Sequence, residues 1–246
     1  MLYWWSKFVL LGPLLRLFCR PTIEGLEHIP ARGGAILASN HLAVVDSFLL
    51  PLLVPRRITF PAKSEYFTKP GLIGRLQKAF FTGVGQIPID RSGGSAARDA
   101  MDTAVRVLRE GRLLGIYPEG TRSPDGRLYK GKTGVARMTL EADVPVVPVA
   151  MIGTDKVNPI GSRMWRPHKV HIRVGEPLDF SRYAGMEGDR FIERSMTDEI
   201  MYALMELSEQ TYVDMYAASV KERAAKAAAK EEPRPAPPPV PDTRAS

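Results

Sequence analysis

The sequence has few of the residues that build cross-links and metal sites. Its 246 residues include a single cysteine, Cys19, which excludes an internal disulfide and a cysteine-rich zinc site and is consistent with a reducing compartment. The four histidines form no H-E-x-x-H pair, so we expect no structural metal. No G-x-S-x-G nucleophile elbow is present. The sequence therefore favours neither a metal centre nor catalysis by a nucleophilic serine or cysteine.

Acidic residues are also outnumbered, 27 against 34 basic ones, which gives a net charge of +7. Such a balance favours an anionic partner: a nucleic acid, a phosphorylated metabolite or an acidic membrane. The chain has no RNA-binding aromatic motif, zinc finger or basic leucine zipper, so we expect phosphate or membrane rather than nucleic acid. Its 44% hydrophobic and 25% charged residues are typical of a globular protein with one domain, or at most two small ones.

The first twenty residues contain no acid and are mostly apolar. Gly12-Pro13 interrupts the run, so it is a poor membrane span. Trp4 and Trp5 suit the headgroup boundary of a bilayer, and Lys7 is expected to snorkel toward water. We therefore predict that residues 1–20 form a membrane-interfacial helix, at the cytoplasmic face of the cell membrane. The alternative is a helix packed on the protein's own core.

Strand-like and helical runs alternate through the middle of the chain. This rhythm predicts an α/β domain over residues 21–230, with a central, mostly parallel or mixed sheet flanked by helices. The predicted strands are Ala35–Ala38, Ile58–Pro61, Gln86–Ile89, Leu113–Tyr117, Val146–Met151 and Val170–Val174. The predicted helices are Ser47–Val54, Gly71–Phe80, Ser95–Glu110 and Gly134–Ala142. A long C-terminal helix is predicted from Arg190 to Lys230, and residues 231–246 are expected to be a disordered, proline-rich tail.

A histidine and an aspartate stand five residues apart between two apolar runs, in the segment Ser39–Asp46. Five residues turn a helix far enough to point the two side chains apart, so they meet only if His41 lies in the turn before a helix and folds back. Together they would be a general base and the carboxylate that orients it. With no protein nucleophile in view, this pair suits direct activation of a substrate hydroxyl. In the plainer alternative, Asp46 caps a helix and His41 is an ordinary turn residue.

Two further segments carry phosphate-binding chemistry. In Gln86–Gly94 a strand ends and Arg91 stands just beyond it, where its guanidinium could clamp a phosphate; a surface pair with Asp90 is an alternative. In Tyr117–Ser123 a loop follows a strand, at the end of the sheet where α/β proteins place ligands. There Gly120 allows close backbone approach, and its neighbours Glu119, Thr121 and Arg122 supply polar groups.

The segment Gly126–Thr133 fits the P-loop expression G-x-x-x-x-G-K-T. A true P-loop begins directly after a buried strand, whereas this segment follows a polar turn. Leu128 and Tyr129 are bulky where phosphate would need the backbone. We interpret the match as fortuitous, and a nucleotide-binding protein that uses Lys132 stays as an alternative of a different class.

Four of these segments in one order resemble the glycerolipid acyltransferase family, particularly bacterial 1-acyl-glycerol-3-phosphate acyltransferases. The motifs are Asn40-His41 with Asp46, then Ile89-Asp90-Arg91, then Tyr117–Ser123, then Val147-Pro148-Val149. The resemblance extends over roughly residues 20–180, and Tyr117 stands where the family usually has phenylalanine.

The resemblance implies an acyltransferase that converts 1-acyl-glycerol-3-phosphate to phosphatidic acid. His41 would be the general base, and Asp46 would orient it. The acyl donor would be acyl-CoA or acyl-carrier protein, and no metal or redox cofactor would be needed. The phosphate-bearing acceptor would be bound by Arg91, Glu119, Gly120, Thr121 and Arg122. Another lipid or glycolipid acceptor would suit the same motifs, and a noncatalytic protein that binds anionic membranes is a further alternative.

Overall fold

The structure is a computed structural model that describes residues 2–83, 85–89, 94–162 and 164–231. Its centre is a sheet in which neighbouring strands are parallel except for one antiparallel pair, β8 with β9. The predicted α/β class, with a mostly parallel or mixed sheet, is confirmed. The strand order is β1 (Thr22–Glu24), β9 (His171–Val174), β8 (Val146–Ile152), β2 (Ala35–Ser39), β6 (Leu113–Ile116) and β3 (Ile58–Thr59).

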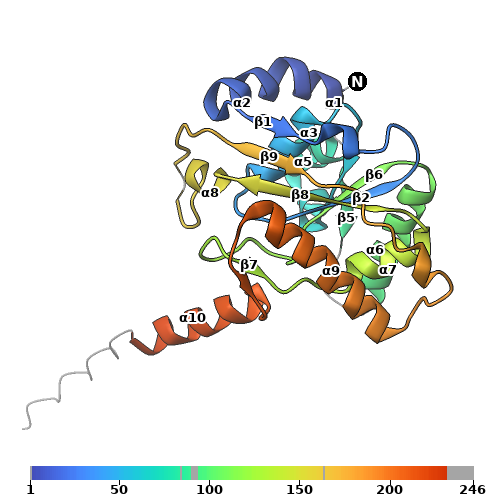
Figure 1. Cartoon of the computed structure of the whole chain (residues 1–246). Coiled ribbons are helices and arrows are strands. Elements are labelled where there is room, and N and C mark those ends of the chain that lie inside the picture. The colour runs from blue at the N-terminus through green and yellow to red at the C-terminus, as the bar shows by residue number, and fades with distance from the viewer. Residues whose placement is uncertain (1, 84, 90–93, 163, 232–246) are drawn as a thin grey trace, which may run out of the picture.

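Helices cover both faces of this sheet (Figure 1). The central strand β2 is buried throughout, as its unbroken apolar sequence requires for a strand covered on both sides. On one face the core contains side chains from α2 (Leu11–Cys19) and α3 (Asp46–Leu53). On the other face it contains side chains from α6 (Gly94–Arg109), α7 (Gly134–Ala142) and α9 (Arg190–Ser208). Three short helical segments lie in the connections: η2 (Leu26–His28), α8 (Thr154–Val157) and η3 (Ser181–Tyr183).

The predicted strand Ile58–Pro61 is divided at Phe60. Its first part, β3, joins the central sheet, and the chain then continues as β4 (Pro61–Lys63), which pairs with β5 (Ile87–Ile89) in a separate two-stranded sheet. The strand predicted at Gln86–Ile89 therefore forms outside the central sheet. Between β4 and β5 lie α4 (Glu65–Thr68) and α5 (Gly71–Gly83).

The prediction of one long C-terminal helix is wrong. Helix α9 ends where Glu209 adopts a left-handed conformation with φ of 59°. The chain then forms β10 (Tyr212–Val213), an aromatic and a β-branched residue that pair with β7 (Leu128–Tyr129). A second helix, α10 (Ala217–Glu231), follows. The tail predicted at residues 231–246 lies outside the described residues apart from Glu231.

The N-terminal segment is a helix packed on the protein's own core, as in the second alternative, and the membrane-interfacial role stays a prediction. It is helical from α1 (Leu2–Trp5) through η1 (Ser6–Leu10, π-helical) to α2. On one side Leu15 and Cys19 are buried in the core. Its exposed apolar side chains are Trp4, Trp5, Phe8, Val9, Leu14 and Leu17. The helix is thus docked on the domain while it presents an apolar face to the surroundings.

Lys7 contradicts the expectation that it snorkels toward water. Its side chain is buried, and Nζ donates a hydrogen bond to the carbonyl oxygen of Val54 at the end of α3, at 2.5 Å. Burial, together with the charge of Arg16, lowers the pKa of Lys7 to about 8. A carbonyl at a helix end is a good partner for a cation, which is why the amine turns inward. No helix in the described part of the chain is both long and apolar enough to span a bilayer.

Candidate active site

The candidate site lies at the carboxyl ends of the adjacent parallel strands β2 and β6. His41 stands two residues beyond β2, and Tyr117 follows β6 directly. Both line a cavity of about 830 Å³ that also reaches the loop 120–122. Ligands of open α/β sheets bind outside the carboxyl ends of strands, so the cavity is where this fold places a site.

The structure brings His41 and Asp46 together. His41 lies in the turn before α3 and folds back, so that its Nδ1 is 2.9 Å from Oδ2 of Asp46. The carboxylate is fully buried, and the same oxygen accepts hydrogen bonds from the backbone N–H groups of Leu42 and Ala43. Asp46 therefore holds the turn and the imidazole at once, and makes no capping bond to its own helix. With Nδ1–H donating to Asp46, Nε2 is left to accept a proton.

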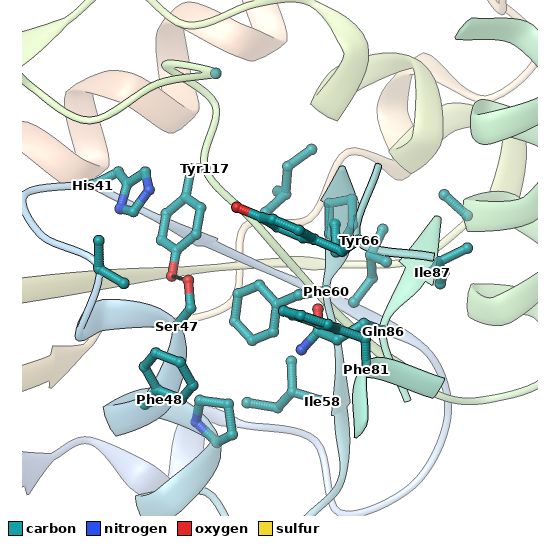
Figure 2. A pocket seen from close by; sticks show the side chains of 18 of the residues that line it. His41, Ser47, Phe48, Ile58, Phe60, Tyr66, Phe81, Gln86, Ile87 and Tyr117 are labelled. Atoms are coloured by element: carbon teal, nitrogen blue, oxygen red, sulfur yellow. Dashed lines mark hydrogen bonds between the residues drawn. The ribbon is translucent and has the colours of Figure 1, made fainter. Parts of the chain in front are cut away.

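A second contact fixes the imidazole from its face. The ring of Tyr117 stacks on His41, and its hydroxyl lies 2.9 Å from Oγ of Ser47, the second residue of α3 (Figure 2). Burial, with the nearby charge of Asp46, raises the pKa of Tyr117 well above its usual value, so the group stays a neutral phenol. Sequence reasoning missed this arrangement. Its signal was the tyrosine at a position where phenylalanine is usual.

Glu119 links the turn that carries His41 to strand β7, through hydrogen bonds to the backbone of both. Its side chain is buried, and its two oxygens accept hydrogen bonds from the N–H groups of His41 at 3.1 Å and Tyr129 at 3.0 Å. The resemblance implied that Glu119 binds the acceptor, whereas the described hydrogen bonds of this carboxylate are to the main chain. Burial raises the pKa of Glu119 to about 7, against the two backbone hydrogen bonds that lower it.

The loop after β6 supplies the polar end of the cavity. Gly120 has φ of +73°, a backbone conformation that strains other residues, so this turn favours glycine. Thr121, Arg122 and Lys132 line the same cavity as His41. Among the described residues, neither Arg122 nor Lys132 has a carboxylate within salt-bridge distance. Unpaired cations at a cavity wall are suited to an anionic ligand. Arg91, the other predicted phosphate ligand, lies outside the described residues.

The P-loop match has no P-loop geometry. Leu128 and Tyr129 are fully buried as strand β7. The N–H groups that would surround a phosphate are used within the protein: Leu128 donates to Thr211, Tyr129 to Glu119, and Lys130 to Val213 and Met215. These contacts argue against the nucleotide-binding alternative, although Lys132 itself does reach the cavity.

The rest of the cavity is mainly apolar. Figure 2 shows Phe60, Tyr66, Phe81 and Ile87 around the space that begins at the His41 and Tyr117 rings. Residues Leu11 and Leu15 of α2 also line it, so the N-terminal helix forms part of the wall. A cavity with one polar end and a long apolar lining suits an amphipathic ligand. In the described part of the chain, no group of three potential metal-binding side chains is present.

Comparisons with known proteins find similar sequences and a similar fold. The 1-acyl-sn-glycerol-3-phosphate acyltransferase of Limnanthes alba is 37% identical over 158 residues, which are 64% of this chain and 54% of that protein. The enzyme of the same name from Bacillus subtilis is 28% identical over 183 residues, 74% of this chain and 84% of that protein. The crystal structure of the 1-acyl-sn-glycerophosphate acyltransferase PlsC from Thermotoga maritima superimposes with a TM-score of 0.58 at 26% identity, covering 78% of this chain and 73% of that one.

The chain spans about half the length of the plant relatives that it matches. The family model described as Acyltransferase matches residues 20–152, a span that contains His41, Asp46 and the loop 120–122. Since that match covers more than half of the 246 residues, the protein belongs to the acyltransferase family.

Proposed function

We propose that the protein is a 1-acylglycerol-3-phosphate O-acyltransferase. It would transfer a fatty acyl group from acyl-CoA or acyl-carrier protein to the free hydroxyl of 1-acyl-glycerol-3-phosphate, giving phosphatidic acid. The observation that carries this proposal is one cavity lined by His41, which Asp46 holds from behind, by Arg122 and Lys132, which have no carboxylate partner among the described residues, and by a long apolar wall. The names of the relatives from Limnanthes and Bacillus support the same acceptor.

The reaction needs a base and no nucleophilic side chain. The acceptor hydroxyl donates its proton to Nε2 of His41 as its oxygen attacks the thioester carbonyl carbon. Asp46, bonded to Nδ1–H, stabilises the imidazolium that forms. The tetrahedral intermediate then expels the thiolate, which takes the proton from the imidazolium to become a free thiol. A new ester bond replaces the thioester bond, and no net proton or electron is consumed.

The polar end of the cavity positions the acceptor for this attack. In the proposal its phosphate lies against the loop 120–122, with Thr121 and Arg122 as ligands and Arg91 as a further one. Binding through the phosphate brings the free hydroxyl to the base at a high effective concentration. Glu119 acts indirectly, because it holds the backbone of His41 in register with this loop.

The apolar side of the molecule fits a lipid substrate and an anionic membrane surface. The cavity wall includes Leu11 and Leu15 of α2, whose opposite side exposes Leu14 and Leu17. The adjacent helix α5, which contacts α1, exposes Leu72, Ile73 and Leu76. We place the protein peripherally on the cytoplasmic face of the cell membrane, with its acceptor entering from the lipid. Nucleic acid and a bound cofactor have no part in the proposal.

Product analysis tests this function directly. The purified protein is given acyl-CoA or acyl-carrier protein together with 1-acyl-glycerol-3-phosphate, glycerol 3-phosphate, a monoacylglycerol or a lysoglycolipid, and products are identified by mass spectrometry. We expect phosphatidic acid as the main product, and its formation should be lost in His41→Ala. Efficient acylation of the monoacylglycerol or lysoglycolipid alone would assign a different acceptor. The absence of any acyl transfer by a folded wild-type protein would contradict the proposal.

A further inference from the structure

Helix α10 reaches the phosphate end of the cavity. Nζ of Lys221, in the second turn of α10, lies 2.9 Å from Oγ1 of Thr121 and also donates to the carbonyl oxygen of Arg122. Figure 1 shows α10 running away from the domain, so this contact is made by its beginning, close to β7. Thr121 and Arg122 both line the cavity that contains His41. A residue about 100 positions along the chain therefore touches the predicted acceptor site.

The charge at this place is unbalanced. No carboxylate lies within salt-bridge distance of Lys221 among the described residues, as is also true of Arg122 and Lys132. Glu119 attracts Lys221 at longer range, but both of its oxygens accept backbone hydrogen bonds. Burial and the charge of Arg122 lower the pKa of Lys221. Cations gathered around one turn repel one another unless an anion joins them.

The hydrogen bonds leave donors available for that anion. A lysine ammonium has three N–H groups, and Lys221 uses two of them on Thr121 and Arg122. Because Oγ1 of Thr121 accepts from Lys221, the hydroxyl hydrogen of Thr121 stays free to donate. The pair therefore presents an N–H and an O–H side by side, which suits the oxygens of a phosphate.

We propose that Lys221 completes the acceptor-phosphate site, which makes the start of α10 part of the active site. The inference rests on the proposed function, since it names a further ligand of the same phosphate. It also extends beyond the span matched by the family model, which ends at residue 152. The charge of Lys221 serves binding, whereas buried Ala217 and the β10–β7 pairing, which immediately precedes the helix, anchor its start without that charge.

Three variants of the full-length protein separate binding from anchoring. Lys221→Met keeps the length of the stem and removes the charge, and Lys221→Arg keeps the charge. Lys226→Met is the matched control, because Lys226 is exposed on the same helix and paired with Glu222. Loss of one hydrogen bond to a charged group should raise the KM for 1-acyl-glycerol-3-phosphate by roughly tenfold to a hundredfold in Lys221→Met. The KM for acyl-CoA should stay unchanged, Lys221→Arg should recover most of the affinity, and Lys226→Met should match wild type.

A binding measurement tests the role of Lys221 without relying on catalytic turnover. Glycerol 3-phosphate, used as a probe in thermal melts, should raise the melting temperature of wild type and Lys226→Met but not that of Lys221→Met. An unchanged acceptor KM and an unchanged melting response in Lys221→Met would overturn the inference. So would a loss of stability with equal effects on donor and acceptor, which would make Lys221 an anchor of α10. A wild-type protein that binds glycerol 3-phosphate through Lys221 but acylates no lysophosphatidic acid would overturn the proposed function instead.

Discussion

The imidazole of His41 lies against the phenol ring of Tyr117, with ring centroids 3.8 Å apart and planes 11° from parallel. Asp46 holds the same imidazole by its edge, through Nδ1. The two contacts fix the ring about different axes, so the direction of Nε2 is set, and the ring itself lines the cavity. Ser47 completes the arrangement, since it bonds the hydroxyl of Tyr117 and follows Asp46 on α3.

The stacking contact should matter more than the hydroxyl. Tyr117→Phe keeps the ring and loses the bond to Ser47, so we expect a fall in kcat of a few-fold at most. Tyr117→Leu loses the flat surface behind His41, and misplacement of a catalytic group by about 1 Å can cost about 100-fold. The measurement is kcat for both variants and for Ser47→Ala, with melting curves as a control for folding. Equal activity of Tyr117→Leu and Tyr117→Phe would show that the stack does not orient the base.

Removal of the base or its partner should reduce turnover and spare substrate binding. His41→Ala should lower kcat by about 10²–10⁴-fold, the usual contribution of a positioned general base. Asp46→Asn should be similarly impaired, because an amide cannot stabilise the imidazolium. Asp46 also accepts backbone hydrogen bonds from Leu42 and Ala43, so its variant needs a melting curve beside the kinetics. A folded His41→Ala protein with near-normal turnover would contradict the mechanism.

The cations at the phosphate end should act on the acceptor alone. Arg122→Ala and Lys132→Met should each raise the KM for 1-acyl-glycerol-3-phosphate by roughly tenfold or more, with little change in the KM for the donor. We expect the same of Arg91→Ala, because the resemblance to the family implies that Arg91 binds the same phosphate. Arg127→Ala is the control, since Arg127 is paired with Asp125 outside the cavity lining. Initial rates at varied acceptor and donor concentrations give both constants. Parallel increases for donor and acceptor would mean that these residues support the fold.

Glu119 should make the free energy of unfolding depend on pH. Its pKa is about 7 in the folded protein and about 4.5 when solvated. Between these values the folded state binds a proton that the unfolded state has released, so the contribution of Glu119 to stability is fully present below pH 4.5 and is lost as pH rises through about 7. The shift corresponds to roughly 3 kcal/mol in the free energy of unfolding. Urea denaturation of wild type and Glu119→Gln from pH 5 to 8 should show a smaller loss in the variant. Parallel curves would exclude Glu119 as the titrating group.

The exposed side of the N-terminal helix should direct membrane binding. Leu14 and Leu17 are 60% and 75% exposed, so the double change to serine should leave the core intact and reduce flotation with anionic vesicles. Phe191→Ser is the control, because Phe191 is an apolar residue at the start of α9 that is even more exposed, at 87%. Deletion of the whole segment is a poorer test, since Leu15 and Cys19 belong to the core. Undiminished flotation of the double variant, with an unchanged melting temperature, would rule out this face.

Local sequence patterns predicted the parts of the molecule that depend on near neighbours. The apolar run at Ala35–Ala38 became the central strand, and the five-residue spacing of His41 and Asp46 placed the base in the turn where the two side chains meet. Both results follow from periodicity and chain geometry within a few residues. The assignment of catalytic and binding roles to these residues stays a prediction.

Local sequence patterns could not predict the contacts between segments that are distant in the chain. The break after α9 depends on β10 pairing with β7, and Lys7 turned inward because the end of α3 offered a carbonyl. Lys221 reached Thr121 through a helix that the sequence pattern merged with α9. In each case the partner lies tens of residues away, where helical or strand periodicity carries no information.

The position of β1 at the edge of the sheet has a consequence for synthesis. Its neighbour is β9, and Thr22 and His171 are 149 residues apart in the chain. Translation at about 5–20 residues per second leaves the N-terminal helix without this anchor for roughly 8–30 s. During that interval its core-facing side is open as well as its exposed side, so in the proposed membrane association the helix would meet the bilayer before the domain closes behind it. Nascent chains stalled before residue 170 should therefore be cleaved by protease near residues 20–24, and chains that extend past β9 should resist.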